Sequence, residues 1–351
     1  MRIAMLCFSL TGYRTGKRLE EGLKNGEREI FLDQKSRYLE NSITESHTEW
    51  TGRQFRESDA IIFIGACGIA VRGIAPYVKN KKTDPAVLVV DECGKYVISL
   101  LSGHLGGAND LAEETAKLLG AVPVITTATD LHKRFAVDIF AKKNDCDIYP
   151  LRAVKVFSST ILAGEKVGFY SDYEWSGKVP EGVAVCDREG RSDTGERLRL
   201  GMAVTIDRAC QPFPYTVWVI PRIVTLGIGC RKGKSGAAIQ SAAQEALERS
   251  GMFREALQGI ASIDLKKEEQ GILQLAEQWK LPFVTYTEEE LRNVPGDFEA
   301  SEFVKQITGV DNVCERSAVL ASGQGNLIQR KHGADGVTTA LAVRDWRMYF
   351  E

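Results

Sequence analysis

Residues 65–130 read GACGIAVRGIAPYVKNKKTDPAVLVVDECGKYVISLLSGHLGGANDLAEETAKLLGAVPVITTATD. Apolar runs over 86–91 and 96–101 favour two strands, and the short polar turn between them predicts a hairpin. An amphipathic run over 110–119 predicts a helix, and 122–127 favours another strand. This alternation is typical of a layered α/β domain with a mostly parallel sheet and one antiparallel hairpin.

The same alternation extends to the N-terminus. The apolar run over 59–66 is continuous, as expected of a strand buried on both faces. A helix that Thr11 or Thr15 caps is expected to end near Leu23. Further expected elements are strands over 2–8 and 29–32 and a helix over 69–78. We assign residues 1–145 to an N-terminal α/β domain with three layers, α/β/α.

Two further units follow along the chain. Residues 146–221 alternate glycine, charge and short apolar runs, which favours a small middle α/β lobe. Its charged segment 187–201 is expected to be a mobile loop. Residues 222–351 are assigned to a C-terminal domain, again with three α/β/α layers. It is expected to open with a strand over 223–228, a glycine-rich turn over 229–234 and a helix over 235–249.

Composition narrows the function classes. The chain has 351 residues, 44% of them hydrophobic, and a formal net charge of -2, so no bulk basic field points to nucleic acid or an anionic membrane. No apolar run approaches the ~18 residues of a membrane helix. Eight cysteines without a C-x-x-C pair, and no signal-like segment, favour reduced thiols and a cytoplasmic protein. No spacing of His, Cys and carboxylates indicates a protein-bound metal.

The turn over 102–109 is the first candidate site. It places Ser102, His104 and Asn109 around Gly103, Gly106 and Gly107, between a predicted strand and a predicted helix. Glycines allow close backbone approach, helix-initial N–H groups favour anions, and an imidazole can transfer a proton near neutral pH. The alternative is a tight turn in which His104 is simply hydrogen-bonded; we favour function.

Other candidates are weaker when taken alone. Arg72 and Lys81, with Asp84 beside them, are candidates to bind a substrate, and the two cations would grip carboxylates beside a cleft. Taken alone, a solvated turn in which Asp84 caps locally is the favoured explanation. Asp91 follows a buried strand, where α/β proteins often place functional groups, but it equally fits a turn cap. Thr127 and Thr129 follow another strand and would either line the same cleft or cap the next segment.

A basic, glycine-rich turn over 227–235 is the last candidate. Gly229 and Gly233 enclose three residues, whereas a phosphate-binding P-loop needs four, and the dinucleotide pattern fails too. The segment is still suited to bind an anion through Gly229, Cys230 and Arg231. A strand-to-helix turn that binds nothing is an equally good explanation.

Together these segments resemble the CbiG family of anaerobic cobalamin biosynthesis. The resemblance rests on GACGIAVRGIAP, on KKTDPAVLVVDECGKYVISLLSGHLGGAN and on VPVITTATD in the N-terminal part. In the C-terminal part it rests on LGIGCRKG, IASIDLKKEE, VCERSAVLAS and the lysine of LIQRK, Lys331. It covers most of the chain in the same order, with a weakly patterned middle.

The resemblance implies an enzyme that opens the δ-lactone of cobalt-precorrin-5A, gives cobalt-precorrin-5B and releases acetaldehyde. The cobalt would arrive in the tetrapyrrole substrate, so no cofactor of the protein's own is implied. Its rim carboxylates would meet Arg72, Lys81, Arg231 and Lys331. Other enzymes of the pathway, and a second copy of the chain, are further partners to consider.

Our hypothesis places His104 as general acid/base in a cleft between the N- and C-terminal domains. Asn109 and Asp91 would orient the imidazole or the water, and the N–H groups of Gly106 and Gly107 would stabilise the oxyanion. A tetrapyrrole carrier without chemistry of its own is the second hypothesis. A nucleotide-binding protein using 229–235 is the third, and the broken spacing argues against it.

Overall fold

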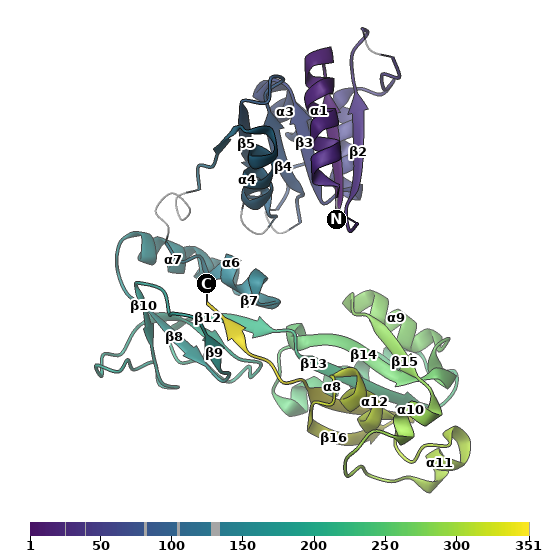
Figure 1. Ribbon diagram of the computed structural model, residues 1–351. Helices are drawn as coiled ribbons and strands as arrows, with labels where there is room; N and C mark the ends of the chain where they lie inside the picture. Colours follow the sequence, from purple (N-terminus) through teal and green to yellow (C-terminus); the bar gives the residue numbers. More distant parts are fainter. Residues whose placement is uncertain (25, 39, 81–82, 104–105, 128–133, 351) are drawn as a thin grey trace. The chain divides into compact units, whose positions relative to one another are not determined.

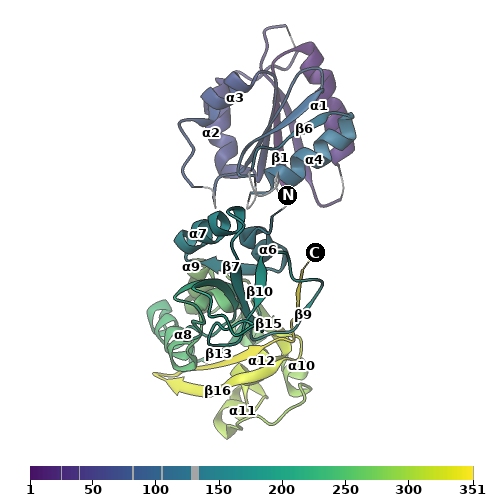
Figure 2. The same ribbon diagram turned by 90° about the vertical axis from the view of Figure 1, so that its left-hand side faces the viewer.

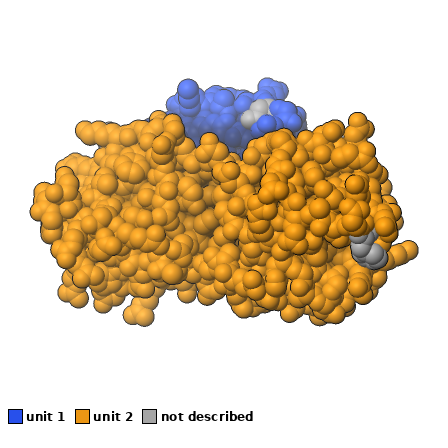
Figure 3. Space-filling view, turned by 90° about the horizontal axis from the view of Figure 1, so that it is seen from below, with its two compact units in different colours: residues 1–134 blue, residues 135–351 orange. Residues whose placement is uncertain are grey.

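The computed structural model describes residues 1–351 except 25, 39, 81–82, 104–105, 128–133 and 351. Contacts divide the chain into two compact units, Met1–Arg134 and Phe135–Glu351, which Figure 3 shows in different colours. We describe each unit by itself. Among the described residues, no helix combines the length and the apolar character that crossing a membrane requires.

The first unit is built on a six-stranded sheet with the order β2-β1-β3-β4-β5-β6. Its strands are β1 (Arg2–Cys7), β2 (Glu29–Gln34), β3 (Ala60–Ile64), β4 (Ala86–Val90), β5 (Tyr96–Leu101) and β6 (Val122–Val124). The first four are mutually parallel, β4 and β5 form the predicted antiparallel hairpin, and β6 is parallel to β5. The mostly parallel sheet with one hairpin is therefore confirmed.

Helices cover both faces of this sheet, so the three-layer prediction for the N-terminal part is confirmed (Figure 2). One face packs under α1 (Leu10–Leu23) and α4 (Ala108–Leu119), and the other under α2 (His47–Glu57) and α3 (Cys67–Ile74). Every residue of β3 and β4 is buried, as continuous apolar runs require. The expected cap of α1 was wrong: Ser9 Oγ, not Thr11 or Thr15, accepts the Gly12 N–H at 3.0 Å.

The second unit begins with a five-stranded sheet of order β10-β8-β11-β12-β7. The strands are β7 (Cys146–Tyr149), β8 (Val167–Ser171), β10 (Val183–Val185), β11 (Leu200–Val204) and β12 (Tyr215–Pro221), with β7 alone antiparallel to its neighbour. Helices α6 (Val137–Lys143) and α7 (Leu151–Leu162) pack on it. Residues of α6, expected in the N-terminal domain, thus belong to the middle core.

The charged segment 187–201 differs from the expected mobile loop. Antiparallel bridges join Cys186 to Ser192 and Arg191 to Arg197, so the backbone folds into two successive turns. The Asp187 carboxylate accepts the N–H groups of Glu189 and Arg191 at 3.0 and 2.8 Å. Local hydrogen bonds of this kind fix the path of a charged segment, and Leu198 adds a small buried cluster with Cys186 and Phe213.

A third sheet, also in the second unit, has the order β15-β14-β13-β17-β16. It contains β13 (Val224–Cys230), β14 (Leu257–Ile263), β15 (Phe283–Tyr286), β16 (Asn326–Ala334) and β17 (Val337–Val343). Helices α8 (Gly236–Ser250) and α9 (Gln270–Trp279) cover one face, and α10 (Glu288–Arg292) and α12 (Val313–Ala321) cover the other. Helix α11 (Glu302–Thr308) lies in a long connection. The three-layer prediction is confirmed here as well.

The end of the chain leaves the third sheet and returns to the middle one (Figure 1). Strand β18 (Met348–Tyr349) pairs in parallel with β9 (Trp175–Ser176). Phe350 is 1% exposed, and its ring stacks on Phe140 with centroids 4.7 Å apart. The last residues of the predicted 222–351 domain therefore complete the core of the middle lobe.

Candidate functional site

The 102–109 turn lies at the edge of the first sheet where the parallel strands begin. Strand β5 runs against β4, so Leu101 at its end pairs with Val87 near the start of β4. The turn that follows β5 therefore reaches the amino edge of β4. His104, the predicted acid/base, lies outside the described residues, as do Lys81 and Thr129.

Ser102 and Asp84 hold the two loops at this edge together. Ser102 has a left-handed backbone, with φ 59°, and its Oγ donates to the Asp84 carbonyl oxygen at 3.0 Å. The buried Asp84 carboxylate accepts the N–H groups of Lys79 and Asn80 at 2.9 and 3.0 Å. Asp84 thus organises the backbone before β4, which is the local cap that the sequence left as an alternative.

The glycines of the turn are required by close packing. A Cβ on Gly106 would lie 2.3 Å from Ser102 Cβ, and one on Gly103 would lie 2.7 Å from Asn109 Oδ1. Gly107 caps α4 with φ 81°, a conformation that costs glycine little. The backbone must therefore approach the side chains of Ser102 and Asn109 more closely than any other residue type allows.

Two helix-initial donors expected to be free are already used. The N–H of Ala108 donates to Ser102 O at 3.1 Å, and that of Asn109 donates to Gly103 O at 3.0 Å. Among the described residues, the N–H groups of Gly106 and Gly107 have no acceptor. Both groups are therefore candidate donors to a developing negative charge, as proposed from the sequence.

Asn109 and Thr127 meet at the same edge. Strand β6 is parallel to β5, so the segment after it arrives beside the 102–109 turn. Asn109 is buried, and its Nδ2 donates to Thr127 Oγ1 at 3.2 Å. The structure therefore brings together Ser102, Gly103, Asn109 and Thr127, with Asp84 behind them.

The structure does not bring Asp91 to this group. Asp91 follows the carboxyl end of β4, whereas the 102–109 turn lies beyond its amino end. Five residues of β4 separate the two edges, about 15 Å at ~3.3 Å per residue. The Asp91 carboxylate accepts the N–H groups of Cys93, Lys95 and Tyr96 at 3.0, 2.7 and 2.5 Å, so it closes the hairpin turn. The predicted hairpin could have shown this separation, because β5 runs in the opposite direction to β4 and carries the 102–109 turn away from Asp91.

Arg72 stays within its own helix. It lies exposed in the last turn of α3, and its Nη1 donates to Gly68 O at 3.3 Å. Among the described residues it has no carboxylate partner.

The basic turn after β13 is a second, separate cluster in the other unit. Position 229 has no room for a side chain, because a Cβ on Gly229 would lie 2.6 Å from Thr338 Oγ1. Burial raises the pKa of the Cys230 thiol despite the nearby Lys266 ammonium, so the thiol is protonated at neutral pH. Arg231 is exposed, and its N–H donates to Gly336 O at 3.0 Å.

A carboxylate that the sequence did not reveal lies in this turn. Glu269 accepts the Gly233 N–H at 2.8 Å and a hydrogen bond from Lys266 Nζ at 3.0 Å. Burial acts to raise the pKa of Glu269, but these two hydrogen bonds outweigh it, and the pKa is lowered. Part of the anion-binding capacity expected of the turn is therefore used by the protein itself.

Lys331 is not part of either cluster. It lies on the edge strand β16, which β17 separates from β13. Its N–H donates to Glu315 Oε1 at 2.6 Å, and its Nζ lies 3.2 Å from Glu299 Oε1. Glu315 is fully buried and also accepts from Asn312 Nδ2 at 2.8 Å. Lys331 is thus tied to an internal polar network. In the described part of the chain, no group of three His, Cys, Asp or Glu side chains is placed to hold a metal ion.

Comparison with known proteins covers most of the chain. Three family models match it: Cobalamin synthesis G N-terminal over residues 49–130, Cobalamin biosynthesis central region over 135–221, and Cobalamin synthesis G C-terminus over 224–342. A protein of Salmonella typhimurium named cobalt-precorrin-5A hydrolase is 39% identical over 301 residues, 84% of each chain.

Two further relatives extend the comparison. A Priestia megaterium protein, also named cobalt-precorrin-5A hydrolase, is 31% identical over 315 residues, which are 82% of this chain and 79% of that one. Protein CobE of a Sinorhizobium species is 30% identical over 121 residues, 34% of this chain and 79% of its own. The two matches to proteins named cobalt-precorrin-5A hydrolase therefore each cover more than four fifths of this chain.

Proposed function

The chain belongs to the CbiG family of cobalamin biosynthesis, and from this we propose that it is a cobalt-precorrin-5A hydrolase. The observation that carries the proposal is the identity of 39% over 84% of both chains to a protein of that name. The substrate is a cobalt-containing tetrapyrrole. We propose that the cobalt is brought by this substrate and that the protein needs no cofactor of its own.

The reaction is a lactone hydrolysis followed by loss of a two-carbon fragment. Water adds to the lactone carbonyl, and the ring C–O bond breaks to leave a carboxyl group and a hydroxyl group. The fragment that carries the hydroxyl loses its O–H proton as its C–C bond to the macrocycle breaks, and it leaves as acetaldehyde. The macrocycle keeps the electron pair of that bond and takes up a proton. A group that removes a proton from water and donors that stabilise the oxyanion are the aids that the first step needs.

We assign these roles to the 102–109 turn. His104 is the proposed general acid/base, and the N–H groups of Gly106 and Gly107 are the proposed oxyanion donors. Asn109, held by Thr127, orients the turn, and Ser102 fixes it to Asp84. Support comes from the two glycine N–H groups that lack an acceptor among the described residues and from the close packing of Gly106 on Ser102. Asp91 has no part in this proposal because it lies at the other edge of the sheet.

A tetrapyrrole carrier is the second candidate function. The observation in its favour is the match to Protein CobE, which covers only about a third of this chain. Binding without turnover would be the signature of such a carrier.

One experiment separates the two functions. The purified protein is incubated with cobalt-precorrin-5A, and acetaldehyde is measured with alcohol dehydrogenase and reduced nicotinamide cofactor. We expect acetaldehyde in proportion to enzyme, and a product mass that reflects gain of one water and loss of one acetaldehyde. Tight substrate binding without either change would reject the hydrolase and support the carrier. We also propose a cytoplasmic location, which cell fractionation tests.

A further inference from the structure

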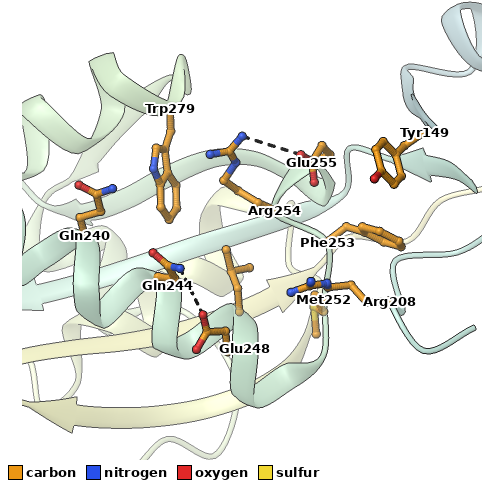
Figure 4. A pocket seen from close by; sticks show the side chains of 11 residues that line it. Tyr149, Arg208, Gln240, Gln244, Glu248, Met252, Phe253, Arg254, Glu255 and Trp279 are labelled. Atoms are coloured by element: carbon orange, nitrogen blue, oxygen red, sulfur yellow. Dashed lines mark hydrogen bonds and ion pairs between the residues drawn. The ribbon is translucent and has the colours of Figure 1, made fainter. Parts of the chain in front are cut away.

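A groove of about 450 Å³ lies between the middle and third sheets of the second unit. Tyr149 and Arg208 reach it from the middle lobe, and Phe253, Arg254 and Trp279 reach it from the other side (Figure 4). It belongs to neither of the two clusters described above. Its wall is formed by α8, the segment before β14 and the end of α9.

Two guanidinium groups line the groove, and one of them is in a long ion pair. Arg208 has no hydrogen-bond or ion-pair partner for its side chain among the described residues. Arg254 lies 3.8 Å from Glu255, beyond hydrogen-bond distance, and 5.9 Å from the centre of the Trp279 ring. Arginine side chains in this state can grip carboxylates in a bidentate manner.

The turn that carries Arg208 is held in place. The Arg208 N–H donates to Gly251 O at 2.8 Å, and Phe253 N–H donates to Ile206 O at 3.0 Å. Trp218 Nε1 donates to Cys210 O at 2.7 Å on the other side of the turn. Binding a ligand would therefore not require the backbone under Arg208 to be ordered first.

Flat aromatic surfaces lie next to these cations. Trp279 and Phe253 are half-buried, and Met252 is buried. Tyr149 is 57% exposed, and its ring stacks on Trp218 with centroids 6.0 Å apart. Aromatic faces beside arginines suit a planar conjugated ring that carries acidic side chains.

We propose that this groove binds one edge of a carboxylated tetrapyrrole, with Arg208 and Arg254 on its acid side chains and Trp279 against its ring. The inference rests on the proposed function, since that function supplies a ligand of this chemistry. The volume falls within the ~300–1,000 Å³ of small-molecule sites and suits part of a macrocycle. Ligand carboxylates would take Arg254 from Glu255, while Glu248 stays bonded to Gln244 at 3.2 Å.

The test compares two stable corrinoids as probes. Cobyrinic acid carries acid side chains, and cobinamide carries amides in their place. Binding to the full chain is measured by calorimetry for the wild type, Arg208→Gln, Arg254→Gln and Arg249→Gln. Arg249 is an exposed arginine of α8 outside the groove and serves as the matched control. Thermal unfolding verifies that each variant is folded.

We expect Arg208→Gln and Arg254→Gln each to weaken cobyrinic acid binding about tenfold or more, as loss of a charge-assisted hydrogen bond does. Cobinamide binding and the Arg249→Gln control should stay within about twofold of the wild type. Equal binding of cobyrinic acid by all four proteins, or no binding by the wild type, overturns the proposal. Acetaldehyde release by the wild type is measured separately. If the wild type releases acetaldehyde but the arginine variants bind cobyrinic acid as the wild type does, the groove proposal alone is rejected. If the variants bind more weakly but the wild type releases no acetaldehyde, the hydrolase proposal alone is rejected.

Discussion

Asn109 donates from Nδ2 to Thr127 Oγ1 at 3.2 Å and so joins the first turn of α4 to the segment that follows β6. The same carboxamide lies where a side chain on Gly103 would have to be. Ser102 secures the other end of the turn through the Asp84 carbonyl. Ser102 and Asn109 are therefore each fixed by a non-local hydrogen bond, one to the segment before β4 and one to the segment after β6.

Thr127→Val tests this link. The change keeps the shape but removes the oxygen that accepts from Asn109. We expect it to lower the free energy of unfolding by about 1 kcal/mol, the usual net value of one hydrogen bond, and to slow acetaldehyde release. Thr126→Val is the matched control, because Thr126 is the exposed neighbour. Urea unfolding and the acetaldehyde assay measure both; equal effects of the two variants would contradict the link.

His104→Ala tests the proposed acid/base. Loss of general acid/base catalysis should lower kcat by ~10²–10⁴ with little change in substrate binding. His332→Gln is the control, since His332 lies in the other unit with its Nε2 3.0 Å from Glu245. Single-turnover assays with binding measured separately decide the matter. Near-wild-type lactone opening by His104→Ala would remove the assignment.

Asp91→Ala should act on stability rather than on the chemical step. Its carboxylate accepts three N–H groups of the hairpin turn, so the variant should lose about 2 kcal/mol or more of unfolding free energy. Asp91→Asn keeps acceptor oxygen and should lose less. For the folded protein, kcat should be unchanged in both. A large fall in kcat with normal stability would show that the opposite edge of the sheet takes part in the reaction.

The lowered pKa of Glu269 predicts a pH dependence of stability. Native contacts favour its charged form, so they stabilise the fold fully above the ordinary value of 4.5, and this contribution is lost as the pH falls through the lower native pKa. Glu269→Gln should be less stable than the wild type at pH 7 by about 1.5 kcal/mol. The two should converge in acid below pH 4.5. Urea unfolding across this range tests it, and a constant difference at all pH values would exclude the mechanism.

Phe350→Ala should unfold the middle lobe more readily. The ring is 1% exposed and stacks on Phe140, so its removal should cost about 3–5 kcal/mol. Tyr349→Ala is the neighbouring control, because Tyr349 is 56% exposed and holds Asn144 through backbone atoms. Thermal and urea unfolding should show a large loss for the first and a small one for the second. Similar losses would mean that the ring does not contribute to the core.

Local signals identified most of the elements. Continuous apolar runs predicted the buried strands β3 and β4, and the Glu92–Lys95 turn predicted the hairpin. Helices α7 and α12 were missed. Helix α7 has no side-chain cap at its start. The start of α12 does carry a signal, because Asn312 precedes it and its side chain accepts the Glu315 N–H, and this signal was overlooked. Ser9 and not Thr11 caps α1, because the helix starts earlier than its apolar pattern.

The sequence by itself determined the layered α/β class, the crowded glycine turn and the family to which the chain belongs, because apolar periodicity, turn residues and motif order are properties of neighbouring residues. Only the tertiary structure decided that Asp91 and Asn109 lie at opposite edges of one sheet, that Glu269 enters the basic turn, and that Phe350 returns to the middle lobe. These relations depend on strand direction and on contacts between distant segments. Such contacts form when apolar faces are buried together, and no local pattern records which segments will meet.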